Sequence, residues 1–386
     1  MLDHSPIRLL FILPSICRAG GGVSEAARLL AHGLARRRDI ALEVVTARSP
    51  HFDEDRPTWP DVPIHVFERS GGGRFGYNPD MMEFLKTKDA DIAHVHGLWM
   101  YHVLAAARWS KRWKKPVIVT PHGMLEPWIM RRSRHLKRLV SFFIQTPFLK
   151  RAAMIQALTR KEVEDIARVV STERVEVIPN FVLPPEPEGP RPAWWRPEMK
   201  GRRVVLFLGR IHEKKGWREL CDAWDALSQS DADFAARIQL VFCGWVNDAP
   251  AFESRVAELA RRHGNITYAG PQFGGEKAAS FRAAEAFILP SKSEGLPMVI
   301  LEAWAAGLRV MMTEACNLPE GFERGAAIRI SEDAATLSAD LQTYFARPET
   351  ELRAIAEAGR ALQAEHYSEQ AVCDRFAQAF HRIVGR

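Results

Sequence analysis

The sequence predicts an α/β protein built from two doubly wound domains, in which helices cover both faces of a parallel sheet. Its 386 residues suffice for two domains of ordinary size, and contents of 47% hydrophobic and 26% charged residues are typical of a globular protein. A buried strand, a glycine turn and a helix follow one another near the start of the chain and again from residue 204. A proline-rich segment separates the two copies, which indicates a linker.

Short apolar runs between turns and helical patterns mark the expected strands of both domains. In the first half these runs are residues 7–13, 42–46, 91–96, 116–120, 152–158 and 175–178. In the second half they are residues 204–208, 240–243, 266–269, 286–289 and 309–313. Open parallel sheets bind ligands at the carboxyl ends of their strands, so the turns after these runs are the candidate site segments.

The first glycine turn, Gly20–Gly22, does not match the fingerprint of a dinucleotide-binding loop. Glu25 stands where the third glycine is required, and the strand at 42–46 ends without the acid that would hold a ribose. A nicotinamide cofactor is therefore not expected. Gly22 remains a position at which a substrate can approach the backbone.

One segment combines an expected anion site with two acidic residues. It runs from the strand at 286–289 through a polar turn into a helix that starts at Pro297. The free N–H groups and the dipole of a helix N-terminus attract anions. Glu294 lies in the turn, and Glu302 lies inside the helix, which is otherwise apolar and expected to be buried. From these residues alone, the two glutamates could equally form local salt bridges or caps.

The second glycine turn follows the strand at 204–208 and carries two cations, Arg210 beside Gly209 and then Lys215. Two cations at the carboxyl end of a strand can neutralise a leaving diphosphate as its charge develops. The alternative is an ordinary solvated basic loop. None of the three Asp-x-Asp pairs in the chain follows a strand as a metal–diphosphate site would require, so no metal site is expected.

Two histidines, His96 and His122, lie at the carboxyl ends of expected strands in the first domain. A single histidine at such a place is more often structural than catalytic, and we interpret His96 as structural. His122 belongs to the string PHGM, which gives it more weight as a site residue.

The strings GRIHEKKG, PHGM and SEGLPMVILEAWAAG resemble the donor-site motifs of glycosyltransferase family 4, which has the two-domain GT-B architecture. Two glutamates separated by seven residues around a glycine turn are the family's pattern, and Glu294 and Glu302 fit it. The resemblance implies that Glu294 faces the transferred sugar and that Glu302 holds the nucleotide ribose. It places Arg210 and Lys215 at the phosphates and His122 at the donor sugar.

The same resemblance implies roles for the remaining site residues and a domain layout. Gly295, Leu296 and Pro297 would bring backbone to the sugar and phosphates, with Gly209 and Gly22 lining the site, and we place Phe273 against the base. An acceptor domain at 1–183, a linker at 184–200 and a donor domain at 201–368 would face a central cleft, and a helix at 369–386 would cross back to the first domain. The family often has glycine after Ile-Pro-Asn, where this chain has Phe181.

The expected activity is transfer of a hexose from a UDP- or GDP-linked donor to a glycan or lipid-linked acceptor, with retention, without a metal cofactor and in bacterial polysaccharide biosynthesis. A sugar-nucleotide epimerase or phosphorylase of the same architecture, and an inactive transferase-like subunit, are the alternatives. The net charge of +6 favours anionic partners, but no aromatic-interleaved basic motif indicates nucleic acid. No apolar run could span a bilayer, and five scattered cysteines fit a reducing cytoplasm.

The segment 127–161 holds nine Lys and Arg and no Asp or Glu, so the rest of the chain carries a net charge of −3. At helical spacing, Arg131, Arg134 and Arg138 share one face, and apolar residues including Phe143 share the opposite face. Pro147 is expected to break or kink the helix. One interpretation is an amphipathic helix with a solvated basic face. The other is that the arginines rest on the anionic inner face of the plasma membrane, where a lipid-linked acceptor would be presented.

Overall fold

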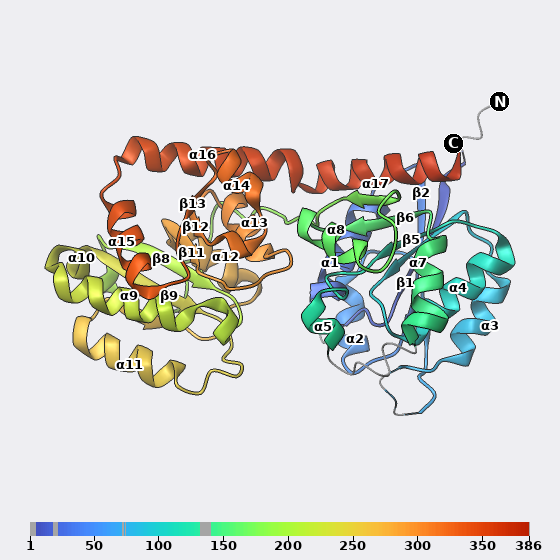
Figure 1. Ribbon diagram of the computed structural model, residues 1–386, viewed down its shortest axis with the longest axis horizontal. Helices are drawn as coiled ribbons and strands as arrows, with labels where there is room; N and C mark the ends of the chain where they lie inside the picture. The colour runs from blue at the N-terminus through green and yellow to red at the C-terminus, as the bar shows by residue number, and fades with distance from the viewer. Residues whose placement is uncertain (1–4, 18–21, 72, 74, 132–139, 386) are drawn as a thin grey trace. The chain divides into compact units, whose positions relative to one another are not determined.

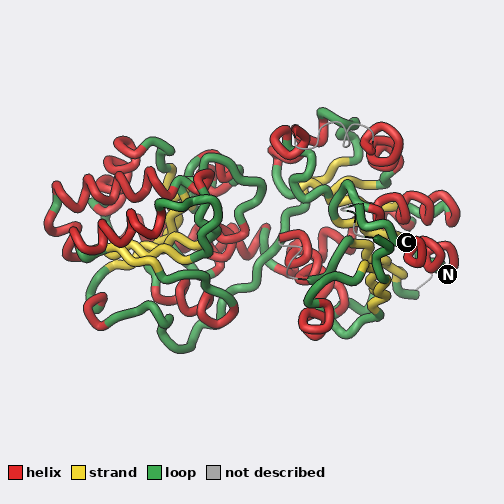
Figure 2. Tube along the Cα trace, turned by 90° about the horizontal axis from the view of Figure 1, so that it is seen from below, coloured by secondary structure: helices red, strands yellow, loops and turns green. Residues whose placement is uncertain are grey.

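The computed structural model divides the chain into two compact units, which are described separately (Figure 1). Unit 1 is Met1–Phe181 with Glu369–Arg386, and unit 2 is Val182–Ser368. The structure describes residues 5–17, 22–71, 73, 75–131 and 140–385. In Figure 2 the strands of each unit, in yellow, are flanked by helices, in red, as expected for doubly wound domains.

Unit 1 contains a seven-stranded parallel sheet of order β3-β2-β1-β4-β5-β6-β7. Its strands are β1 (Ile7–Leu13), β2 (Ile40–Ala47), β3 (Ile64–Phe67), β4 (Ile92–His96), β5 (Val117–Thr120), β6 (Met154–Ala157) and β7 (Val175–Val177). The sheet confirms all six strands predicted for the first half. It adds β3, which is short and only partly buried and therefore shows little apolar pattern in the sequence.

The helices of unit 1 pack as two layers against the sheet. The α-helices are α1 (Gly22–Ala35), α2 (Phe52–Asp55), α3 (Pro79–Thr87), α4 (Tyr101–Trp113), α5 (Pro127–Arg131), α7 (Thr146–Arg151), α8 (Arg160–Ala167) and α17 (Glu369–Val384), with a 3₁₀ turn at Arg56–Thr58 and a π-helix at Ser141–Gln145. One core cluster joins the sheet to α1 and α17, and a second joins its other face to α3, α4, α7 and α8. Because α17 packs so closely on α1, a Cβ at Gly33 would lie 2.4 Å from Cys373 Sγ.

Unit 2 contains a six-stranded parallel sheet of order β10-β9-β8-β11-β12-β13. Its strands are β8 (Arg203–Leu208), β9 (Ile238–Cys243), β10 (Ile266–Tyr268), β11 (Ala286–Leu289), β12 (Arg309–Met312) and β13 (Ala327–Arg329). Its α-helices are α9 (Trp217–Ser230), α10 (Ala232–Arg237), α11 (Phe252–His263), α12 (Gly274–Ala283), α13 (Met298–Ala305), α14 (Pro319–Glu323), α15 (Ala334–Phe345) and α16 (Glu349–His366), with 3₁₀ turns at Pro197–Met199, Glu213–Lys215 and Glu314–Cys316. Chain order reverses between β8 and β11, and this reversal is the topological switch point at which such sheets bind ligands.

The proline-rich segment expected as a linker belongs to unit 2 and is anchored on it. Trp194 is buried and donates its indole N–H to Ser280 Oγ at 2.9 Å, and the guanidinium of Arg282 bonds to the Glu186 and Pro190 carbonyl oxygens. Met199 also enters the core of the unit. The segment is irregular in conformation, as its prolines predict, but it is packed rather than a free spacer.

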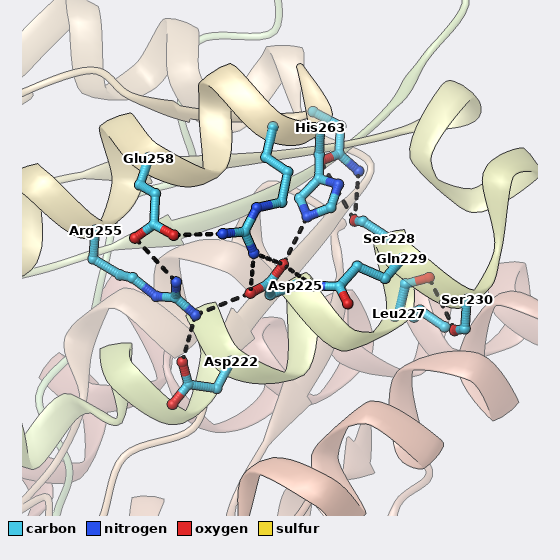
Figure 3. Close-up of polar contacts among 11 residues, drawn as sticks. Asp222, Asp225, Leu227, Ser228, Gln229, Ser230, Arg255, Glu258 and His263 are labelled. Atoms are coloured by element: carbon cyan, nitrogen blue, oxygen red, sulfur yellow. Dashed lines mark hydrogen bonds and ion pairs between the residues drawn. The ribbon is translucent and has the colours of Figure 1, made fainter.

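An ion-pair network joins α9 to α11 around Asp225 (Figure 3). The Asp225 carboxylate accepts hydrogen bonds from His263 Nε2 at 2.7 Å and from Arg262 at 3.0 Å, and Arg255 lies 3.1 Å away. Burial alone would raise the pKa of Asp225, but the bonds from His263 and Gln229 and the charge of Arg262 outweigh it and lower the pKa to about 2. Asp225 therefore stabilises the fold as a carboxylate.

This network predicts a pH-dependent contribution to stability. A depressed pKa stabilises the fold above the ordinary value of about 3.8, and the contribution is lost as the pH falls towards about 2. Asp225→Asn should lower the free energy of unfolding at pH 7 by roughly 1–2 kcal/mol after allowance for solvent screening. Differential scanning fluorimetry should show the gap to the wild type closing below pH 4. Asp233→Asn, at a carboxylate that is 84% exposed, is the control, and an equal effect of both variants would contradict the assignment.

Candidate functional site

Two turns meet at the switch point of unit 2, although they are about eighty residues apart in the chain. The first follows β8 and the second follows β11, and these strands are hydrogen-bonded neighbours. The Lys292 amide donates to the Lys214 carbonyl oxygen at 2.8 Å. Gly216 has φ 68°, and a Cβ there would lie 2.0 Å from the Pro290 carbonyl oxygen, so the close approach of the turns requires glycine.

Lys215 and Glu294 form an ion pair across these turns, with 2.6 Å between Nζ and Oε1. Their side chains are only 16% and 11% exposed. Ser291 Oγ donates to the same carboxylate oxygen at 2.5 Å, and Asn317 donates to the Glu294 carbonyl oxygen. The structure thus brings together two residues predicted for one site. Lys215 and Ser291 hold the Glu294 carboxylate, and Asn317 holds its backbone.

Arg210 lies at the same edge of the sheet and is exposed. Within the described part of the chain, it makes no hydrogen bond or ion pair. The neighbouring Gly209 amide donates to the Cys243 carbonyl oxygen at 2.9 Å, and a Cβ at Gly244 would lie 1.7 Å from the Gly209 carbonyl oxygen. The backbone here is tightly held, whereas the guanidinium is available to an incoming anion.

Glu302 projects from α13 and forms an ion pair with Lys277 of α12, with 2.5 Å between Nζ and Oε1. The two side chains are 22% and 29% exposed, so the carboxylate is less buried than the apolar sequence of the helix predicted. Lys277 was not predicted as a site residue, because it lies 25 residues before Glu302 and only the packing of α12 beside α13 reveals the contact. Each predicted glutamate therefore has a lysine partner.

The helix N-terminus differs from the prediction by one residue. Pro297 has φ −76° and ψ 94° and is the N-cap, so the first helical residue is Met298. Gly295 is exposed and Leu296 is partly exposed, while Pro297 is buried. The eight-residue helix therefore presents its first N–H groups beside an accessible turn, as an anion site requires.

Phe273 and Trp245 form an exposed aromatic pair at the carboxyl ends of β10 and β9. Their ring centroids lie 6.2 Å apart with an interplanar angle of 19°, and the residues are 67% and 48% exposed. Exposed rings of this size are unusual on a protein surface and offer flat faces to a ligand. The sequence analysis named Phe273 but missed Trp245, whose position directly after a strand and a glycine was the available signal.

In unit 1, His122 follows β5 and has a left-handed backbone, with φ 54°. Its Nε2 lies 3.2 Å from Nδ1 of His96, the last residue of β4. Burial lowers the pKa of His122 to about 4 and that of His96 well below its ordinary range, so both rings are neutral at neutral pH. His96 is buried, in keeping with a structural interpretation, but its ring contacts a predicted site residue.

Gly22 is the exposed first residue of α1, and no heavy atom outside its chain neighbours would lie within 4 Å of a Cβ there. The rest of the glycine turn, residues 18–21, lies outside the described residues. The position of Gly22 at the carboxyl edge of β1 leaves its predicted role as a substrate-facing residue open to test.

The basic segment departs from its predicted pattern. Arg131 ends α5, but its side chain and the whole of Arg134 and Arg138 lie outside the described residues. Phe143, which helical spacing assigned to the apolar face, is 68% exposed and stacks edge-on against Phe142, which is 72% exposed. Pro147, expected to break or kink the helix, lies in the first turn of α7, where the π-helix Ser141–Gln145 is followed by an α-helix. No helix among the described residues is long and apolar enough to cross a membrane.

Comparisons with known proteins identify the family. Residues 20–184 match the family model described as Glycosyltransferase Family 4, and residues 202–346 match the model described as Glycosyl transferases group 1. The chain is 26% identical over 360 residues to alpha-maltose-1-phosphate synthase of Mycobacterium tuberculosis, covering 83% of this chain and 91% of that one. It is 24% identical over 251 residues to 2-deoxystreptamine N-acetyl-D-glucosaminyltransferase of Niallia circulans, covering 62% of each protein.

The fold is also that of solved transferases. Anabaena HepE, in complex with UDP and glucose, superposes with a TM-score of 0.72 at 17% identity, covering 97% of this chain and 100% of that chain. Both family models together cover most of the sequence, and the two parallel-sheet units are those of the GT-B architecture. The chain therefore belongs to glycosyltransferase family 4, a family of GT-B transferases that use nucleotide-sugar donors.

Proposed function

We propose that this protein transfers a hexose from a nucleotide sugar to a glycan or lipid-linked acceptor, with retention of anomeric configuration, in bacterial polysaccharide biosynthesis. Unit 2 binds the donor, and unit 1 carries the acceptor. The observation that carries the proposal is the meeting, at one switch point, of Glu294, the N-terminus of α13 and the cationic turn after β8. Retention follows from the family resemblance.

The donor nucleotide would lie along the carboxyl edge of the unit 2 sheet. Glu302 would accept hydrogen bonds from the ribose hydroxyls. The exposed pair of Phe273 and Trp245 would stack on the base, a contact worth about 1–3 kcal/mol. The structure of HepE with UDP supports a UDP-linked donor, with GDP as the alternative nucleotide. Thermal-shift measurements with UDP, GDP and ADP identify the nucleotide, because a bound ligand stabilises the folded state.

The transferred sugar and the diphosphate would lie between Glu294 and the N-terminus of α13. When the bond from the anomeric carbon to the diphosphate breaks, negative charge grows on the leaving group. Arg210, Lys215 and the free N–H groups at the start of α13 would stabilise this charge. The acceptor hydroxyl oxygen forms the new bond to the anomeric carbon.

The two glutamates should affect different kinetic constants. Glu302→Gln should raise the KM for the donor about tenfold, because the ribose contact is present in the ground state and in the transition state alike. Glu294→Ala should instead lower kcat, because its contact is made at the reacting sugar. Initial rates with the nucleotide sugar identified by thermal shift, and with acceptor saturating, measure both.

Glu253→Gln, at an exposed position on α11, is the control for these variants. Wild-type kinetics in both Glu294→Ala and Glu302→Gln would contradict the assignment of the site. Turnover of the nucleotide sugar at the same rate without any acceptor would instead indicate an epimerase or a phosphorylase.

Side-chain cations should make the reaction independent of divalent metal. Activity should persist in EDTA, whereas Arg210→Ala should lower kcat/KM by about 30- to 1000-fold, which corresponds to roughly 2–4 kcal/mol of transition-state stabilisation. Arg210 is exposed, so the variant should keep the wild-type melting temperature. Loss of activity in EDTA with rescue by Mg²⁺ or Mn²⁺ would contradict the role given to the cations.

A peripheral contact with anionic membrane would bring a lipid-linked acceptor to unit 1. The exposed pair of Phe142 and Phe143 lies in a segment of nine basic and no acidic residues, and aromatic side chains beside cations are suited to a membrane interface. The protein should sediment with anionic but not neutral vesicles and should be released by high salt. A double change of Phe142 and Phe143 to Ser, or a triple change of Arg131, Arg134 and Arg138 to Glu, should abolish sedimentation.

Leu183→Ser, at a residue that is 51% exposed in unit 2, is the matched control for removal of surface apolar area. Equal sedimentation of the wild type and the double and triple variants would leave the segment without a role at the membrane.

A further inference from the structure

Four histidines gather around the carboxyl edge of the unit 1 sheet. His94 and His96 lie on β4, His102 lies on α4, and His122 follows β5. The rings of His94 and His96 have centroids 4.1 Å apart, and those of His96 and His122 have centroids 5.5 Å apart. Burial lowers the pKa of each ring, so all four are neutral at neutral pH, and each carries one N–H donor and one acceptor nitrogen.

Two of these tautomers follow from hydrogen-bond partners. Gln156 donates its amide N–H to the Ile178 carbonyl oxygen at 2.6 Å, so its oxygen must accept from Thr120 Oγ1 at 2.5 Å. The Thr120 hydroxyl proton is thereby used, and His94 Nε2, 2.7 Å away, must be the donor to Thr120. His102 Nε2 lies 3.0 Å from the His96 carbonyl oxygen and must also be a donor.

The hydrogen-bond partners of the neighbouring rings also determine the tautomer of His96. Within the described residues, the buried nitrogens His94 Nδ1, His102 Nδ1 and His96 Nε2 have no hydrogen-bond partner. His94 Nδ1 and His102 Nδ1 carry no proton, because the proton of each neutral ring is on Nε2. A buried N–H without a partner is rarer than a buried lone pair without one, so His96 Nε2 is also the bare nitrogen. His96 therefore carries its proton on Nδ1 and donates it to His122 Nε2, which leaves the His122 proton on Nδ1.

The backbone at His122 is fixed by a second buried group. Glu162, which is 6% exposed, accepts the Gly123 amide N–H at 2.6 Å and the Leu158 amide N–H at 2.7 Å. These bonds hold the turn in which His122 adopts φ 54°, a conformation that is uncommon for a residue with a side chain. The backbone and the ring of His122 are thus each held by a different residue.

We propose that His96 is a positioning residue, which fixes His122 in the tautomer that presents Nδ1–H as a hydrogen-bond donor to an oxygen of the sugar substrate. The inference rests on the proposed function for the identity of that ligand, but the tautomer does not depend on it. A neutral donor suits a sugar oxygen, because it can recognise a hydroxyl or ether oxygen without introducing a charge. His96 is therefore more than a structural residue, because it determines which ring nitrogen of His122 carries the proton.

Asparagine and leucine at position 96 separate this role from packing. The amide N–H of His96→Asn lies near the place of imidazole Nδ1 and can still donate to His122, whereas His96→Leu fills the apolar pocket without a donor. Long-range ¹H–¹⁵N spectra of histidine-labelled protein, with His122 assigned from His122→Gln, report the protonated nitrogen directly. The wild type and His96→Asn should show His122 protonated on Nδ1, and His96→Leu should show a mixture that includes Nε2–H.

The kinetics should follow the spectra. His96→Leu should lower kcat about tenfold with the donor KM changed less than twofold, and His96→Asn should recover most of the loss, while both melting temperatures confirm folded protein. A wild-type His122 protonated on Nε2, or equal losses in the two variants, would overturn the inference. If His122→Gln has wild-type kinetics while the Nδ1–H tautomer is observed, the positioning by His96 stands and the role of His122 in the proposed function fails.

Discussion

The proposed donor site of unit 2 depends on the parallel pairing of β8 with β11. Chain order reverses between these two strands, so the turns that follow them lie side by side with no helix crossing between them. The approach is close enough that a side chain at Gly216 would collide with the Pro290 carbonyl oxygen. Lys215 and Glu294 can therefore meet at 2.6 Å while they belong to different βα units. A shift of either strand by one residue would separate them.

The charge balance of this site has a consequence for ligand binding. Glu294 and Glu302 each have a lysine partner, so the ion pairs leave little net charge, and the exposed Arg210 adds a positive charge. A diphosphate would compete with the two glutamates for the lysines. Because a largely buried carboxylate is costly without a partner, Glu294 would need new hydrogen bonds as Lys215 turns to the phosphates, and sugar hydroxyls can supply them. Binding of sugar and of diphosphate would then favour each other.

The sequence predicted the parts of the fold that depend on local pattern. Eleven apolar runs became strands, and most of these are buried on both faces, where a strand reads as a continuous apolar segment. β3 and β13 were missed; both are short and only partly buried, as are β7 and β10, which the runs at 175–178 and 266–269 did predict. Tertiary contacts inside α1 were also beyond local pattern: Ser24 lies in this helix and donates to the Ser15 carbonyl oxygen.

The sequence predicted the residues of the candidate site, but it did not predict which side chains contact one another there. Motif spacing identified Glu294, Glu302, Arg210 and Lys215. Lys277, on α12, and Trp245, after β9, come from other parts of unit 2 and have no fixed spacing to the motif. The prediction for the basic segment was wrong for a different reason. Helical periodicity assumes 3.6 residues per turn, and the π-helix at Ser141–Gln145 changes the angle between successive residues, so Phe143 left its predicted face.

The two units have polar groups at the carboxyl ends of their parallel strands, but these groups are charged in unit 2 and neutral in unit 1. The edge of the unit 2 sheet collects charges of both signs at positions that are 11% to 29% exposed, where water still screens them and an anionic ligand can exchange partners. At the edge of the unit 1 sheet, His94 and His96 are buried beside Phe11, and His94 also lies beside Phe376 and Phe380, which disfavours a charged ring. A neutral imidazole has one N–H donor, and its tautomer decides which ring nitrogen can donate to a ligand oxygen. The tautomer must therefore be fixed by a neighbouring group. A buried histidine neighbour can specify it, because it offers a donor without adding a charge that would itself need a partner.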